Sequence, residues 1–132
     1  MTPLESLYYA IGELAYAIAC ADGTIQQEER MKFNEMVTKQ LDFHNHGFDI
    51  SSIIFQIMVR DKASLPDSYH WAIKEIKLNS HYLSPRLKRC FITVMEKVAA
   101  AFPPVTIEEK ALIDKFREDI EPLEGDPVYY ES

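Results

Sequence analysis

Hydrophobic side chains recur at spacings of three and four residues along most of the chain, a pattern typical of helices with one buried face. The first such stretch predicts a helix from about Leu4 to Ala21, with Pro3 suited to its first turn. Alanines at several other positions would let neighbouring helices approach closely, so we expect this helix to be central. Its predicted core residues are Leu4, Leu7, Tyr8, Ile11, Leu14, Ala15 and Ile18.

The same pattern predicts a second helix over 27–41 and a third from Ser51 or Ser52 to about Ala63. Between them, 42–47 has no sustained period and is rich in turn formers, so it predicts a loop. The residues of the third helix expected to point inward are Ile53, Ile54, Ile57 and Met58.

Three more helices are predicted in the second half, each with a capping signal at its start. The adjacent prolines Pro103 and Pro104 end the fifth helix. The capping residues are Ser64 ahead of the fourth helix, Ser84 with Pro85 for the fifth, and Thr106 with Glu109 as a capping box for the sixth.

The sequence therefore predicts an all-α fold, a single compact domain of six to seven helices. A chain of 132 residues, 47% of them hydrophobic, suits one core. We assign residues 1–121 to the domain and 122–132 to an acidic C-terminal tail that either docks on its own domain or on a partner, or is frayed. No targeting signal or membrane-spanning stretch is evident, which predicts a cytoplasmic protein.

The net charge of -7 disfavours nucleic acid and anionic membranes as partners. Residues 60–97 nevertheless carry 8 basic and 4 acidic side chains. Most basic runs are solvated faces, but this one could receive an acidic partner, such as the tail of another copy, which leaves homo-oligomers open. The basic side chains concerned are Lys74, Lys77, Arg86, Lys88 and Arg89.

Two cysteines, Cys20 and Cys90, continue apolar helical stripes rather than showing metal-ligand spacing. We expect both to be buried, reduced and not linked to each other.

An ungapped shift of 80 residues superposes the first predicted hairpin on the last, with Ile25 on Val105, Glu28 on Glu108 and Glu29 on Glu109. This match predicts two pseudo-repeated helix-turn-helix halves, 4–41 and 84–120. One difference is that the turn Asp22-Gly23-Thr24 has become Phe102-Pro103-Pro104.

The run Ala21-Asp22-Gly23, followed by Ile25 and Glu28-Glu29 and echoed near the C-terminus, resembles the TerB-like family of tellurite-resistance proteins and co-chaperone N-terminal domains. The resemblance implies a non-enzymatic stress-response and protein-interaction domain. It also implies that Asp22, Glu28 and Glu29 interact with a divalent metal ion.

The same three carboxylates have a simpler interpretation, in which Asp22 accepts amide hydrogen bonds in the turn and Glu29 caps the next helix. The segment matches the second half of a calcium-binding EF-hand loop, but Ile18 and Cys20 occupy the first ligand positions, so that type of site is rejected. His44 and His46 in the predicted loop are a weaker candidate for zinc.

No nucleophile motif or phosphate-binding glycine loop is present in the sequence, so we predict that the chain is not an enzyme. Two functions stay open: a protein-interaction domain of the TerB-like kind, and a small protein that binds a divalent metal through its acidic Asp-Gly turn.

Overall fold

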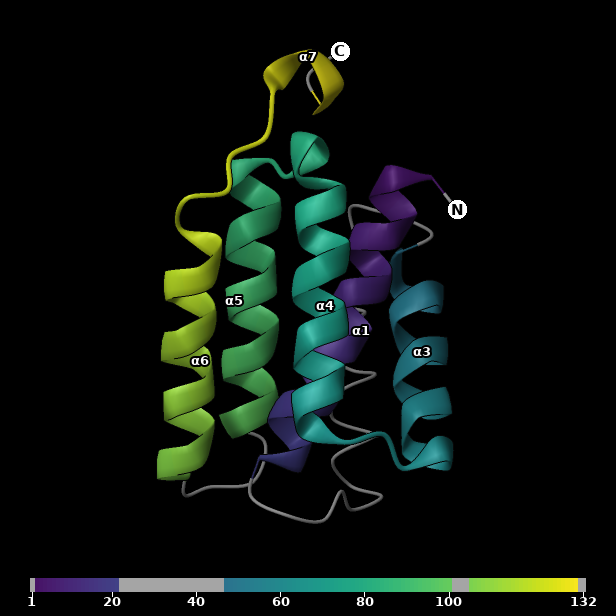
Figure 1. Ribbon diagram of the computed structural model, residues 1–132, viewed down its shortest axis with the longest axis vertical. Coiled ribbons are helices and arrows are strands. Elements are labelled where there is room, and N and C mark those ends of the chain that lie inside the picture. The colour runs from purple at the N-terminus through teal and green to yellow at the C-terminus, as the bar shows by residue number, and fades with distance from the viewer. Residues whose placement is uncertain (1, 22–46, 101–104, 131–132) are drawn as a thin grey trace.

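The computed structural model describes residues 2–21, 47–100 and 105–130, and these form six α-helices, one 3-10 turn and no β-strand. The predicted all-α fold is confirmed. Figure 1 shows the long helices running along the longest axis of the molecule, with α1 behind the others. The elements are α1 (Pro3–Cys20), α3 (Gly47–Asp61), α4 (Leu65–Leu78), η1 (Ser80–Tyr82), α5 (Pro85–Ala100), α6 (Ile107–Ile120) and α7 (Pro127–Tyr130).

Helix α1 is the centre of the core, as its small residues predicted. Its first turn is fixed by a capping box in which the Thr2 amide donates to Glu5 Oε1 at 2.8 Å and the Glu5 amide donates to Thr2 Oγ1 at 3.1 Å. It packs against α3, α4 and α5 and, over a smaller area, α6. Because neighbours surround it, every residue from Ser6 to Ala19 except Tyr9 is buried.

Helices α1 and α3 approach each other closely at Gly12. A Cβ atom on Gly12 would lie 2.5 Å from the backbone oxygen of Ser51 and 2.5 Å from Cγ2 of Ile54, so only glycine fits here. Beside it, the buried hydroxyl of Ser51 donates a 2.7 Å hydrogen bond to the carbonyl oxygen of Tyr8. This bond ties the start of α3 to α1.

Helix α3 corrects two of the predictions. It begins at Gly47, about one turn before the predicted start, since the turn ahead of Ser51 continues the packing against the core through the half-buried Ile50. Ile53, expected to point inward, is 56% exposed. The buried face instead follows the helical spacing of Ser51, Ile54, Phe55 and Met58, which leaves Ile53 on the opposite side.

The three capping predictions in the second half are confirmed. Ser64 Oγ accepts from the Asp67 amide at 3.2 Å, Ser84 Oγ accepts from the Leu87 amide at 3.1 Å, and Thr106 and Glu109 form a capping box. Each bond satisfies an amide at a helix N-terminus that has no partner within the helix. Helices α4, α5 and α6 therefore begin within a residue of the predicted positions.

The cysteine prediction holds in part. Cys20 and Cys90 are thiols with no disulfide between them. Cys90 is buried, and burial raises the pKa of its thiol to about 11. Cys20, the last residue of α1, is only partly buried because the helix ends where it leaves the core.

The described part of the C-terminal tail contacts its own domain. The Gly125 amide donates to the Leu83 carbonyl at 3.1 Å and the Asp126 amide donates to the His81 carbonyl at 3.0 Å. The ring of Tyr129 in α7 lies 4.9 Å from the His81 ring and 5.3 Å from the Tyr82 ring, centroid to centroid. Figure 1 shows α7 above the upper ends of α4 and α5.

The predicted second helix, 27–41, lies outside the described residues, so the predicted relationship between 4–41 and 84–120 stays a prediction. Within the described ranges, no helix combines the length and apolar character needed to cross a membrane.

Candidate functional site

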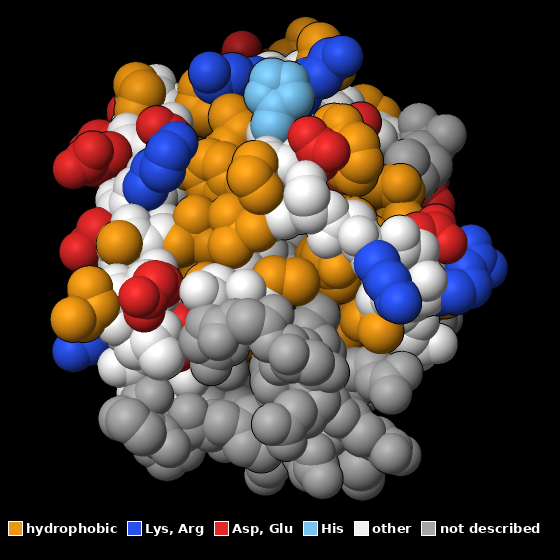
Figure 2. Space-filling model, turned by 60° about the horizontal axis from the view of Figure 1, so that its bottom comes forward, with side chains coloured by type: hydrophobic (Ala, Val, Ile, Leu, Met, Phe, Trp, Pro, Cys, Tyr) orange, Lys and Arg blue, Asp and Glu red, His pale blue; other side chains and the backbone are white. Residues whose placement is uncertain are grey.

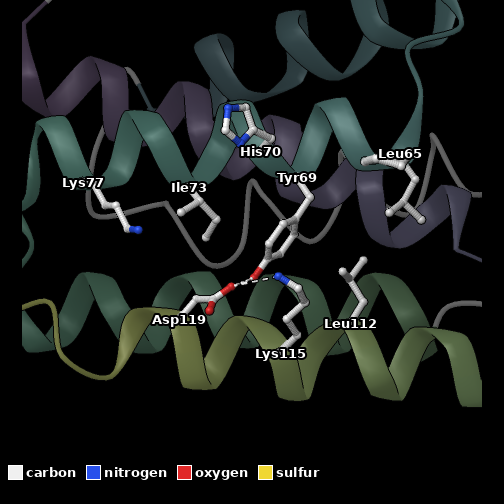
Figure 3. A pocket seen from close by; sticks show the side chains of 9 residues that line it. Leu65, Tyr69, His70, Ile73, Lys77, Leu112, Lys115 and Asp119 are labelled. Atoms are coloured by element: carbon white, nitrogen blue, oxygen red, sulfur yellow. Dashed lines mark hydrogen bonds and ion pairs between the residues drawn. The ribbon is translucent and has the colours of Figure 1, made fainter.

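A groove of about 580 Å³ runs between α4 and α6 on the outside of the bundle. Both helices contribute apolar side chains and polar side chains to its lining (Figure 3). Its lining consists of Leu65, Pro66, Tyr69, His70, Ile73 and Lys77 from α4, with Leu112, Lys115 and Asp119 from α6.

A hydrogen-bonded contact crosses the middle of this groove. The hydroxyl of Tyr69 donates to Asp119 Oδ2 at 2.5 Å. Lys115 Nζ lies 3.3 Å from the same oxygen and 4.5 Å from the centroid of the Tyr69 ring. The ammonium is therefore held by a carboxylate and by an aromatic face, which fixes one positive charge in the groove.

The electrostatics of this contact set the charge state of its members. The hydrogen bond from Tyr69 lowers the pKa of the Asp119 carboxyl, and Lys115 and Lys77 lower it further. Burial raises the pKa of the Tyr69 phenol, and the hydrogen bond to Asp119 raises this pKa further. At neutral pH the groove thus contains an ionised Asp119 and a neutral phenol that acts as a donor.

The two ends of the groove differ in polarity. Figure 3 shows Lys77, Ile73 and Asp119 toward one end and Leu65 and Leu112 at the other, with Tyr69 and Lys115 between them. The apolar end lies toward the lower end of the molecule, where α4 and α6 both begin (Figure 1). Figure 2 brings that end forward and shows apolar side chains gathered on it between charged ones. The groove can hold an anionic group at one end and hydrocarbon at the other.

A second, smaller cavity of about 440 Å³ lies beside the C-terminal half of α5. Two of its four charged side chains, Glu96 and Arg117, pair with each other at 3.1 Å, both about half exposed. The others are Lys110 and Asp114, so the formal charges of this cavity cancel, whereas those of the α4–α6 groove leave one positive charge.

The most unusual buried group is Glu13 in the middle of α1. Its side chain is 3% exposed, and Oε1 makes no hydrogen bond to the residues that the structure describes. Burial raises the pKa of this carboxyl to about 8, and the charge of Glu75 on α4 raises it as well. Glu13 is therefore protonated at neutral pH, which avoids burying an unpaired charge in the core.

The residues predicted to bind metal cannot be placed. Asp22, Glu28 and Glu29 lie outside the described residues, as do His44 and His46, so both metal sites stay predictions. In the parts of the chain that the structure describes, no three His, Cys, Asp or Glu side chains are grouped in a way that could hold a metal ion.

The predicted basic patch is divided between two helices. Lys77 lines the α4–α6 groove, whereas Arg86, Lys88 and Arg89 belong to α5. Lys88 Nζ lies 3.4 Å from the carbonyl oxygen of Glu121, at the end of α6. Of the five basic residues, Lys77 is part of the lining of the α4–α6 groove.

No family model, curated protein or solved structure matches this chain. The resemblance to the TerB-like family therefore stays an expectation from the sequence.

Lys115 and Asp119 were not among the functional residues predicted from the sequence. Their spacing of four residues on one helix was a signal that they form a pair. No local pattern indicates that Tyr69 contacts them, because Tyr69 is 50 residues from Asp119 along the chain.

Proposed function

We propose that this chain is a protein-interaction domain that binds a segment of a partner protein in the α4–α6 groove, in a stress-response role similar to that of TerB-like proteins. The observation that carries the proposal is the composition of the groove. It joins apolar side chains, of which Leu65 and Ile73 are half-buried and Leu112 is buried, to a few fixed polar groups, which is the usual character of a ligand-binding surface.

The size and position of the groove also support a polypeptide ligand. It is open along two parallel helical walls rather than enclosed, so a chain can enter from the side. Recognition of a peptide in a groove between helices requires apolar anchors along its length, and these are Ile73 near one end and Leu65 with Leu112 at the other.

A charge placed at the apolar end tests this function. Leu65→Arg puts a guanidinium group where an apolar anchor would bind, and Ile53→Arg makes the same change at an exposed isoleucine on α3, outside the groove. Proteins captured from native extract by the wild type would be identified, purified and tested for direct binding. We expect Leu65→Arg to weaken binding by about tenfold or more, and Ile53→Arg to leave it within about twofold.

Both variants should keep the circular dichroism spectrum and melting temperature of the wild type. A partner that binds Leu65→Arg as tightly as the wild type, or that loses binding only in Ile53→Arg, would contradict an interface in this groove.

A further inference from the structure

The charged side chains of the α4–α6 groove are two lysines and one aspartate, Lys77, Lys115 and Asp119. The groove therefore has an excess of positive charge on a chain whose net charge is -7. This local excess is opposite in sign to the net charge of the chain, and it favours an anionic ligand.

Lys77 is the more available of the two cations. Its side chain is exposed, and among the described residues its ammonium makes no ion pair. It is close enough to Asp119 to lower the pKa of that carboxyl, so it lies at the polar end of the groove. Figure 3 shows its side chain directed from α4 into the space between the helices.

Lys115 also retains capacity for a ligand. An ammonium group has three donors, and the side chain is 59% exposed although it pairs with Asp119. The Tyr69 ring beneath it restricts its position, so less conformational entropy would be lost when it contacts a carboxylate.

The anionic group alone would occupy only half of the groove. Leu65 and Leu112 line the groove beyond Tyr69 and Lys115, and a free phosphate or carboxylate at Lys77 would leave this end uncovered. A ligand that covers both parts carries an acidic group and apolar side chains on the same short segment.

We propose that the occupant of the α4–α6 groove is an acidic amphipathic peptide segment, whose carboxylate pairs with Lys77 at the polar end and whose apolar side chains cover Leu65 and Leu112. This inference rests on the proposed function and specifies the class of partner. The ionised Asp119 disfavours a nucleic acid as the ligand. A single acidic group can bind at Lys77, but further phosphates along the groove would be repelled by the charge of Asp119.

A library of random 12-residue peptides displayed on phage tests the proposal with the full chain as bait. We expect the selected peptides to be enriched in Asp or Glu next to Leu, Ile or Phe. The best of them would be synthesised with a fluorescent label and titrated by anisotropy. Lys77→Glu is expected to weaken their binding by about tenfold and raised salt to weaken it for the wild type, because the charge pairs are exposed.

Arg89→Glu is the matched control, since it makes the same change of charge at an exposed residue of α5 that does not line the groove. We expect it to change the affinity by less than about twofold. Selected peptides that are neutral or basic, and that depend on Leu65 but not on Lys77, would overturn the acidic class and leave the proposed function standing. A selection that yields no peptide whose binding falls in Leu65→Arg would overturn both.

Discussion

The hydroxyl of Tyr69 on α4 donates a 2.5 Å hydrogen bond to the carboxylate of Asp119 on α6, and so joins two helices that are far apart in the sequence. Lys115 reinforces this contact from the α6 side. The bond holds the two walls of the groove at a fixed separation, so it contributes to stability and to the shape of the binding surface together.

Replacing Tyr69 by phenylalanine removes this hydrogen bond and little else. We expect Tyr69→Phe to lower the free energy of unfolding at pH 7 by about 1 kcal/mol, because Asp119 is partly exposed and water replaces the lost donor. Urea denaturation of the two proteins measures the difference.

The same pair predicts how that difference depends on pH. The pKa of Asp119 is lowered from its ordinary 3.8 in the folded protein, so the stability it contributes is present above 3.8 and is lost as the pH falls through the lowered value. The gap between wild type and Tyr69→Phe should therefore narrow in strong acid. A gap that is absent at pH 7, or that widens on acidification, would show that the bond does not stabilise the ionised carboxylate.

Glu13 predicts a pH dependence of the opposite sign. Its pKa is about 8 in the folded protein and near 4.5 in the unfolded chain, so between these values the folded state binds the extra proton. The free energy of unfolding should therefore fall as the pH rises through this window, with a limiting slope of about 1.4 kcal/mol per pH unit.

Glu13→Gln cannot ionise and should lose this slope, so the variant is expected to gain stability relative to the wild type between pH 5 and pH 8. Thermal melts across that range provide the measurement. Glu75→Gln serves as a comparison. Removing the charge of Glu75 should lower the pKa of Glu13 in the folded protein, so the fall in the free energy of unfolding should end at a lower pH. Parallel stability curves for wild type and Glu13→Gln would contradict a buried, protonated carboxyl.

Gly12 tests the packing of α1 on α3. Alanine is a better helix former than glycine by about 1 kcal/mol, but its methyl group would lie 2.5 Å from the backbone oxygen of Ser51. Backbone cannot move aside as a flexible side chain can, so we expect Gly12→Ala to lower the free energy of unfolding by about 1–3 kcal/mol in chemical denaturation. Equal or higher stability would mean that the two helices are farther apart than described.

The predicted metal site at the Asp-Gly turn has its own test. Calorimetry with calcium, magnesium and zinc on the wild type and on Asp22→Asn should show weak heat that disappears in the variant if Asp22, Glu28 or Glu29 bind the ion. No saturable binding at millimolar ion, together with a lower melting temperature for Asp22→Asn, would instead assign Asp22 to holding the turn.

Local chemistry made part of the fold predictable. Ser64, Ser84 and Thr106 mark helix starts because a short polar side chain satisfies amides a few residues away, and this depends on neighbours in the sequence alone. The central place of α1 followed from its alanines. The burial of Ile53 was predicted wrongly because several adjacent isoleucines fit more than one helical face, and the packing against α1 decides among them.

The groove was less accessible to sequence reasoning. The helices that form its walls were predicted from the periodic pattern, but such a pattern does not say which helices face each other. The Tyr69–Asp119 contact depends on the relative positions of α4 and α6, which both pack around α1. The burial of Glu13 was also hard to predict. If α1 packed against a single helix, Glu13 would face solvent, but α1 packs against several helices and Glu13 is therefore buried.

The burial of α1 on nearly all sides has a consequence for the order of events during synthesis. Its 18 residues leave the ribosome before α3, α4 and α5, and only Glu5 and Glu13 among them carry charge. Until residues up to Ala100 have emerged, this helix has no complete surface to bury against, so the nascent chain exposes its most apolar segment first. Folding is then limited by contacts between distant parts of the chain, and we expect the growing chain to depend on chaperones that shield α1 until α5 arrives.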